Sequence, residues 1–167
     1  MNLFFYDVDV DYINYLKKSD LEKRGFTRVP DIKYNNERKM VCGVVLEING
    51  FKYYVPISSY KKKQNNNLLI VLNDDAYNKV KGSLRFNFMF PVFDDCLSRR
   101  DFSKEKPGRA EFLRRQWVYC NSIESDIRKM ADETYNAVIE KRDKDLVHAS
   151  CDFKLLEVAA SQYKKKE

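Results

Sequence analysis

The sequence predicts an α+β protein in which a compact antiparallel sheet or barrel precedes a layer of helices. Up to about residue 106, apolar residues alternate with polar ones or form short runs between turn signals, which is typical of strands. From residue 107 onward they recur every three or four positions, which is typical of amphipathic helices. We therefore expect a single domain over residues 1–167, with a barrel core over about 1–106 and a helical layer over about 107–167.

The first half reads as short strands with one helix and one loop. A strand is expected first, then a short helix over residues 11–18 and a long polar loop over residues 19–38. Asn49–Gly50 predicts a two-residue hairpin between the two strands that follow. Large apolar residues alternate from Leu84 to Phe90, as in a half-buried strand. The expected strands cover residues 3–8, 39–48, 52–57, 68–72 and 84–90.

The C-terminal third predicts two helices. Apolar residues from Leu113 to Val138 advance by threes and fours, which predicts one long amphipathic helix. Asp152 is a favourable N-cap residue, and we expect a shorter final helix from there to Lys164.

Composition narrows the function classes. The chain has 167 residues, 44% of them hydrophobic and 34% charged, and its net charge of +6 favours a polyanionic partner such as nucleic acid. No segment approaches the roughly 18 apolar residues of a membrane span, and no basic leader of a secretory signal is evident, so we expect a cytoplasmic protein. The four cysteines are widely spaced, which argues against a zinc site and favours reduced thiols; Cys42 is expected in the core.

A basic and aromatic stretch is the strongest functional signal. No acidic residue occurs between Ile48 and Asn73, so the lysines there create a local positive field suited to phosphate contacts. Tyrosines interleaved with them offer faces on which unpaired bases can stack. A merely solvated hairpin end is the alternative. The residues concerned are Lys52, Lys61, Lys62 and Lys63, with Tyr53, Tyr54 and Tyr60.

The same stretch has side chains that suit RNA cleavage by the 2′-hydroxyl. That reaction needs proton transfer at two oxygens and stabilisation of charge on the phosphorane. The sequence has one histidine, His148, so a histidine pair is excluded, whereas lysine, tyrosine and serine side chains can act in a positive pocket. Ser59 and Lys61 would share a face of an extended strand, and Ser58 would point the other way unless the strand is already turning there. There is no GxSxG, P-loop or GxGxxG motif.

Four separated motifs resemble the ToxN/AbiQ family of endoribonuclease toxins from type III toxin–antitoxin systems. The central run GVVLEINGFKYYVPISSYKK, residues 43–62, carries most of the likeness. The segment FMFPV at 88–92 and CDFKLLE at 151–157 resemble the family's strand and C-terminal helix. The helix with Gln116, Asn121 and Ile127 resembles its long helix. The likeness spans nearly the whole chain, and CptN-type members are a candidate subgroup.

The resemblance implies a fold and an activity that spacing alone does not give. The fold would be a MazF/Kid-like barrel with added helices. The activity would be metal-independent cleavage of single-stranded RNA that leaves a 2′,3′-cyclic phosphate. The partner would be a repeated, pseudoknotted RNA antitoxin in a closed toxin–RNA assembly, and the substrates would be cellular or phage RNA. The role would be growth inhibition and abortive infection against phage.

The resemblance also implies site residues. Ser59 and Lys61 match the family's Ser-x-Lys positions, so they are expected to be catalytic: Ser59 positions the phosphate or manages the 2′-hydroxyl proton, and Lys61 stabilises the phosphorane or protonates the leaving oxygen. Ser58 keeps a hydroxyl where threonine is commoner, and Tyr60 replaces a common proline. Tyr34 and Lys39 match an upstream tyrosine–lysine pair, with Arg38 as the alternative to Lys39. The expected RNA-binding residues are Tyr60, Lys62, Lys63, Lys52, Arg38 and Arg85.

Two other functional classes remain open from the sequence. The chain would be a non-catalytic RNA-binding module if the basic surface only held RNA. It would be a protein-binding toxin, comparable to a gyrase poison, if the target were a protein. The lysine-rich stretch disfavours the second, because the cores of protein interfaces are depleted of lysine.

Overall fold

The centre of the protein is a seven-stranded antiparallel sheet, as the computed structural model of residues 1–34, 37–74 and 77–165 shows. Its hydrogen-bonded order is β6-β7-β5-β4-β1-β9, and β8 pairs with part of β5. A two-stranded ribbon of β2 and β3 stands apart from this sheet. The strands are β1 Phe4–Val8, β2 Lys33–Tyr34, β3 Glu37–Arg38, β4 Val41–Ile48, β5 Phe51–Ser58, β6 Asn67–Asp74, β7 Tyr77–Arg85, β8 Phe90–Pro91 and β9 Leu97–Arg99.

The sheet is open, so the sequence-based expectation of an antiparallel sheet is confirmed and that of a closed barrel is wrong. In the described part of the chain, β6 and β9 form the two ends of the strand order and do not pair with each other. The Asn49–Gly50 hairpin between β4 and β5 is confirmed: both residues have positive φ, 55° and 80°, as a tight hairpin turn requires. Cys42 is buried in the core, as expected.

Helix α1 is longer than the sequence predicts. It continues to Arg24 and stops where Gly25 adopts a left-handed conformation with φ of 80°. The expected loop over residues 19–38 is therefore wrong for its first part. Those residues are polar but accept helical backbone, and the buried side chains of Tyr12, Ile13 and Leu16 hold the helix against the core. The helices are α1 Val10–Arg24, α2 Pro107–Ser122, α3 Glu124–Ile139, α4 Lys144–Ala149 and α5 Phe153–Gln162.

The expected single long helix is two helices, because the backbone breaks at Ile123. This residue has φ of −114° and ψ of 26°, and its N–H bonds back to carbonyls of the last turn of α2. Just before the break, the Asn121 carboxamide accepts a hydrogen bond from the backbone N–H of Leu3 and donates one to its carbonyl. The final helix is confirmed, and the Asp152 carboxylate caps it by accepting from the N–H of Leu155.

The expected strand over residues 84–90 is also wrong. Strand β7 ends at Arg85, and Phe86–Phe88 form a turn of 3-10 helix. Alternating apolar residues there do not line one sheet face, because the turn directs Phe86, Met89 and Phe90 into the core together. The carbonyl of Asn87 accepts from the N–H of Cys151 at 2.9 Å, which holds the turn against the segment before α5.

Tyr53 and Tyr54 are core residues, so their expected role as stacking faces for bases is wrong. They are 0% and 2% exposed. The hydroxyl of Tyr53 donates to Glu157 Oε2 at 2.7 Å, and the hydroxyl of Tyr135 donates to the same oxygen at 2.7 Å. The strand thus alternates less than the sequence suggests, because residues on both of its faces are covered.

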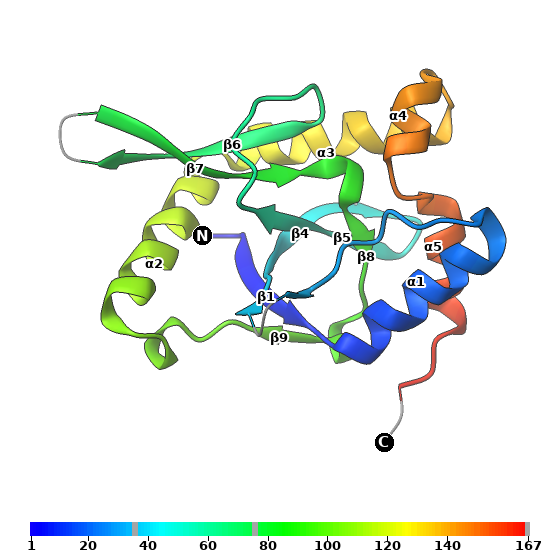
Figure 1. Cartoon of the computed structure of the whole chain (residues 1–167), viewed down its shortest axis with the longest axis horizontal. Helices are drawn as coiled ribbons and strands as arrows, with labels where there is room; N and C mark the ends of the chain where they lie inside the picture. Colours follow the sequence, from blue (N-terminus) through cyan, green and yellow to red (C-terminus); the bar gives the residue numbers. More distant parts are fainter. Residues whose placement is uncertain (35–36, 75–76, 166–167) are drawn as a thin grey trace.

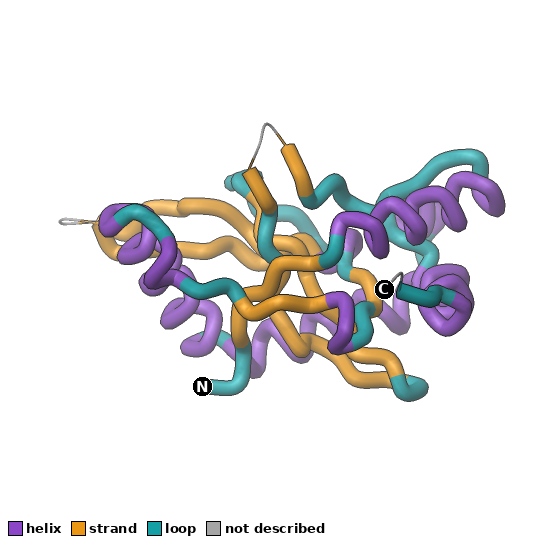
Figure 2. Tube along the Cα trace, turned by 90° about the horizontal axis from the view of Figure 1, so that it is seen from below, coloured by secondary structure: helices purple, strands orange, loops and turns teal. Residues whose placement is uncertain are grey.

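Helices α2, at one end of the molecule, and α1 and α5, at the other, flank the sheet, and α3 packs against β4 (Figure 1). Helix α2 lies beside the long β6–β7 hairpin, and α1 and α5 pack together at the other end (Figure 1). The β2–β3 ribbon projects away from the main sheet (Figure 2). No helix in the described ranges is long and apolar enough to cross a membrane.

Candidate active site

A pocket of about 490 Å³ lies where β5 ends, between that end and α2. We call it the basic pocket. Two serines, Ser58 and Ser59, line it together with four cations contributed by three separate parts of the chain. None of its described lining residues is acidic, so its field is positive and favours an anion. The cations are Arg38, Lys39, Lys81 and Arg109.

The two serines lie together because the strand turns. Strand β5 ends at Ser58, and the Ser58 Oγ accepts a hydrogen bond from the N–H of Tyr60 at 3.1 Å, a local turn of the kind that serine favours. Extended alternation would send Ser58 and Ser59 to opposite faces, but both line the basic pocket. The strand is therefore already turning at Ser58, which is the condition under which the sequence allows both serines to face the same side.

Gly82 on β7 allows this turn to lie close to the sheet. Ser58 pairs in register with Ser83, and a Cβ placed on Gly82 would lie 2.4 Å from the Ser58 carbonyl oxygen. The Ser83 hydroxyl donates to the carbonyl of Tyr60 at 2.7 Å, which fixes the chain just beyond the serines. A side chain at position 82 would therefore displace the segment that presents Ser58 and Ser59.

Lys81 enters the basic pocket through a β-bulge. Ile70 pairs with Gly82, but the next residue on β6, Val71, pairs with Val80, so Lys81 is the extra residue of β7. A bulge redirects the side chain at that position, and bulges are frequent beside active sites. The sequence analysis missed Lys81 because nothing in the alternation of this strand marks the bulge.

The segment before β4 contributes Arg38 and Lys39. The ribbon pairs Lys33 with Arg38, and the N–H of Lys39 donates to the carbonyl of Ile32 at 2.6 Å. Both Arg38 and Lys39 line the basic pocket, so either can be the basic residue of the upstream tyrosine–lysine pair. Tyr34 lies in β2 of the same ribbon, and its side chain is outside the part of the chain that the structure describes.

Helix α2 forms the opposite wall with one face. Arg109, Phe112, Leu113 and Gln116 recur at helical spacing and all line the basic pocket. Gln116 is 4% exposed, an unusual position for a carboxamide. The sequence analysis assigned no site role to Arg109 or Gln116. The sequence feature that could have identified them is that Arg109 and Gln116 stand at the two ends of a helix face whose other residues are apolar.

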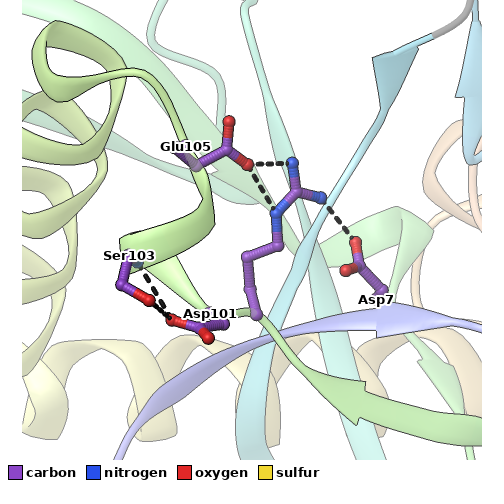
Figure 3. Close-up of polar contacts among 5 residues, drawn as sticks. Asp7, Asp101, Ser103 and Glu105 are labelled. Carbon is purple, nitrogen blue, oxygen red and sulfur yellow. Dashed lines mark hydrogen bonds and ion pairs between the residues drawn. The ribbon is translucent and has the colours of Figure 1, made fainter.

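Arg100 ties the segment that leads into α2 to strand β1. Arg100 follows β9; its Nη1 donates to Asp7 Oδ1 of β1 at 2.7 Å and its Nε to Glu105 Oε1 at 2.9 Å, as Figure 3 shows for both carboxylates. Burial lowers the pKa of Arg100, but the bonds to Glu105 and Asp7 outweigh it and leave the pKa raised. Asp101 accepts from the N–H and hydroxyl of Ser103 in the same turn (Figure 3), and these bonds lower the pKa of Asp101.

Lys61 and its two neighbours follow the serines in an exposed loop and do not line the basic pocket. The Lys63 ammonium donates to the carbonyl of Asn67 at 2.7 Å, and the Asn67 carboxamide donates to the carbonyl of Lys62 at 2.9 Å. Asn67 is 1% exposed and thus ties the loop together. Lys61 and Lys62 present their side chains to solvent next to the pocket's serines.

Tyr60 and Arg85 form a separate contact beside that loop. The guanidinium of Arg85 lies 4.6 Å from the ring centres of both Tyr60 and Phe88. Burial lowers the pKa of Arg85, although Tyr60 acts in the opposite direction. Lys52 lies at the far end of β5, about 20 Å from Ser58 at about 3.3 Å per residue, so the structure does not bring it to the basic pocket.

The described residues contain no group of three or more histidine, cysteine, aspartate or glutamate side chains placed to hold a metal ion. His148 lies exposed in α4, with its ring 5.0 Å from Phe26, away from the basic pocket. The chemistry that the basic pocket supports directly is therefore anion binding by cations beside hydroxyl groups.

Comparison with known proteins gives a consistent match along the chain. The family model described as toxin ToxN of type III toxin–antitoxin systems matches residues 4–161. Endoribonuclease AbiQ from Lactococcus lactis subsp. lactis is 31% identical over 99% of this chain and 92% of its own length. Endoribonuclease ToxN from Bacillus thuringiensis subsp. kurstaki is 25% identical over 98% of this chain and 85% of its own length.

Solved structures match at the level of the whole fold. A toxin from a study of selective toxin inhibition by a non-coding RNA pseudoknot in type III systems has a TM-score of 0.84 and 25% identity, with 99% of this chain and 100% of that chain covered. AbiQ, described as a lactococcal anti-phage endoribonuclease, has a TM-score of 0.81 and 29% identity, with 99% of this chain and 100% of that chain covered.

Proposed function

The chain belongs to the ToxN family of toxins from type III toxin–antitoxin systems, and we propose that it is an endoribonuclease that cuts single-stranded RNA in the basic pocket. The observation that carries the proposal is the pocket itself. Ser58 and Ser59 lie beside four cationic side chains, with no acidic residue among the described lining. A positively charged surface of this kind favours a phosphodiester. RNA is the polyanion that fits both the charge of the pocket and the family.

The chemistry we propose is transesterification within the RNA strand. The 2′-oxygen attacks the adjacent phosphorus, a new O–P bond forms, and the bond to the 5′-oxygen breaks, which leaves a 2′,3′-cyclic phosphate. The Ser59 hydroxyl passes the proton of the 2′-hydroxyl on to solvent water, and Lys61 supplies the proton that reaches the 5′-oxygen. The cations of the basic pocket supply the charge that this step needs at the phosphorane, and so the reaction is proposed to be metal-independent.

Residue roles follow from position. Ser59 and Ser58 hold the scissile phosphate, since their hydroxyls lie at the turn where β5 ends. Lys39, Lys81 and Arg109 stabilise the phosphorane from three sides of the basic pocket. Lys61, two residues beyond Ser59 in the exposed loop, protonates the leaving oxygen once RNA brings the loop over the pocket. Tyr34 and Arg38 complete the proposed site on the ribbon side.

Outside the pocket, Lys62, Lys63, Tyr60 and Arg85 are proposed to bind the strand on either side of the cut. Lys52 is proposed only as a distant phosphate contact, because it lies at the other end of β5. The natural inhibitor is proposed to be a repeated pseudoknot RNA that the toxin processes and that holds it in a closed assembly. The setting is proposed to be the bacterial cytoplasm, where its free, buried thiols stay reduced and RNA cleavage arrests growth during phage infection.

One assay tests the centre of this proposal. Purified protein and the Ser59→Ala variant are incubated with unstructured RNA in excess EDTA, and the new ends are identified. We expect cyclic-phosphate ends from the unmodified protein alone. Equal RNA binding by both proteins without any cleavage would instead favour a non-catalytic RNA-binding module. Growth arrest without RNA binding would favour a protein target.

A further inference from the structure

A carboxamide in the wall of the basic pocket makes no hydrogen bond to any residue that the structure describes. Gln116 is 4% exposed and lies between Leu113 and Cys120 on α2, both 0% exposed. No hydrogen bond joins its side chain to any other residue in the described ranges. Its nitrogen and oxygen are not among the described side-chain atoms that are both enclosed and unbonded, so they reach the pocket, where a ligand can replace water as their partner.

The position of Gln116 separates it from the phosphate-binding groups. The cations and serines of the basic pocket come mostly from the strand side, namely the ribbon, the end of β5 and the bulge of β7. Gln116 lies on the helix side with Phe112 and Leu113, and Arg109 lies about two turns before it. The strand side thus carries the serines and three of the four cations, whereas the helix side has Arg109 at one end, the neutral carboxamide of Gln116 at the other and apolar side chains between them.

This division suits a nucleotide better than a phosphate alone. A volume of about 490 Å³ lies within the range of small-molecule sites, far more than one phosphate group needs. A base has an apolar face and an edge that offers hydrogen-bond donors and acceptors. The half-buried ring of Phe112 and the side chain of Leu113 provide apolar contact for the face, and the carboxamide matches an edge with a donor beside an acceptor.

We propose that Gln116 is a specificity-determining residue that reads the base next to the scissile phosphate through its carboxamide. The proposal rests on the function proposed above and adds to it which residue sets sequence preference at the cut. A carboxamide carries no charge, so it contributes little to phosphate binding beside four cations. It discriminates between bases because a mismatched edge leaves the buried amide unpaired, and each good contact of this kind distinguishes bases by about 1–3 kcal/mol, or about 5- to 150-fold.

The test compares cutting preference. Unmodified protein, Gln116→Met and Gln116→Glu are given an unstructured RNA with a randomised segment in excess EDTA, and the cut positions are sequenced. Gln116→Met keeps the length of the side chain and removes the hydrogen bonds, so we expect preference at one nucleotide beside the cut to flatten by about fivefold or more. Gln116→Glu only accepts hydrogen bonds and is expected to shift that preference toward bases with an exocyclic amine.

The matched control is Gln162→Met at the exposed end of α5, which makes the same chemical change away from the basic pocket and should leave preference unchanged. A uniform loss of cutting at all sequences would overturn the inference and assign Gln116 to the phosphate. Unchanged preference in a folded Gln116→Met protein would overturn it too.

Failure of the proposed function gives a different result. If the unmodified protein cuts no RNA, binding of 2′-deoxy oligonucleotides that differ at one base is compared between the unmodified protein and Gln116→Met. Loss of base-dependent affinity in the variant would support base reading without catalysis. Equal base dependence in both proteins, or none in either, would overturn it.

Discussion

The two ends of strand β5 place polar side chains in opposite situations. Near its start, the Tyr53 hydroxyl is buried and bonded to Glu157, which also accepts from Tyr135. At its end, Ser58 and Ser59 face a cavity with cations and no acidic residue among the described lining. A buried polar cluster that is satisfied internally contributes to folding, whereas hydroxyls that face a pocket stay accessible to a ligand. The difference indicates a stabilising role for one end and agrees with the chemical role that we propose for the other.

The largest expected effect is the loss of cleavage in Ser59→Ala. Loss of one hydroxyl at the developing phosphorane charge is expected to lower the cleavage rate about 100- to 1000-fold, because groups aimed at transition-state charge are worth that much. The thermal midpoint should stay unchanged, since Ser59 is exposed. Single-turnover cleavage and thermal melting measure the two effects. Ser98→Ala on the exposed edge strand β9 is the matched control, and an equal loss there would contradict the assignment.

The opposite result is expected from Glu157→Ala at the other end. Two buried hydroxyls lose their acceptor, and at about 1–3 kcal/mol each the free energy of unfolding should fall by about 3 kcal/mol. For a chain of this length that lowers the midpoint by about 10 °C. Protein that remains folded should still cut RNA. Glu133→Ala, an exposed residue of α3, should leave the midpoint nearly unchanged, and an equal fall for both would refute the role of the buried carboxylate.

Gly82→Ala is expected to affect both stability and cleavage. Its Cβ would lie 2.4 Å from the Ser58 carbonyl oxygen, so the end of β5 must shift. We expect about 1–3 kcal/mol of lost stability, together with slower cleavage at temperatures where the variant is folded. Gly108→Ala, where a Cβ meets nothing within 4 Å, is the control and should reduce neither. Full activity in Gly82→Ala would show that the serines tolerate displacement.

The smallest expected effect is a pH dependence of stability from Tyr53. Burial, with added contributions from the bond to Glu157, raises the pKa of Tyr53 above its ordinary value of 10.0. Below pH 10 the hydroxyl is protonated in both states and contributes no slope. Above pH 10 only the unfolded state releases the proton, so the free energy of unfolding falls by about 1.4 kcal/mol per pH unit from this group. Denaturant titrations should show a shallower fall for Tyr53→Phe, and identical slopes would contradict the burial argument.

The predictability of the fold follows the range of the interactions involved. The Asn49–Gly50 hairpin and the Asp152 cap were predicted because each depends on a few adjacent residues. The break at Ile123 was not, since Asn121 just before it bonds to Leu3 at the other end of the chain. The turn at Phe86 likewise depends on a bond to Cys151. Local patterns thus determine elements, and distant partners determine where they stop.

The candidate site divides in the same way. Ser58 and Ser59 were predicted because they are adjacent and match a family motif, and the structure places them in one pocket with the upstream cations. Lys81 depends on a bulge set by pairing with β6, and Arg109 depends on how α2 docks. Neither placement is encoded by spacing within its own segment.

The break at Ile123 has a consequence for motion. It separates α2, whose inner face borders the basic pocket, from α3, which has five buried residues including Tyr135. A continuous helix would exchange its backbone amides as one cooperative unit, whereas two helices open independently. Hydrogen exchange should therefore be faster in the first turns of α2 than in the middle of α3. Helix α2, which forms one wall of the basic pocket, can then open while α3 stays packed in the core.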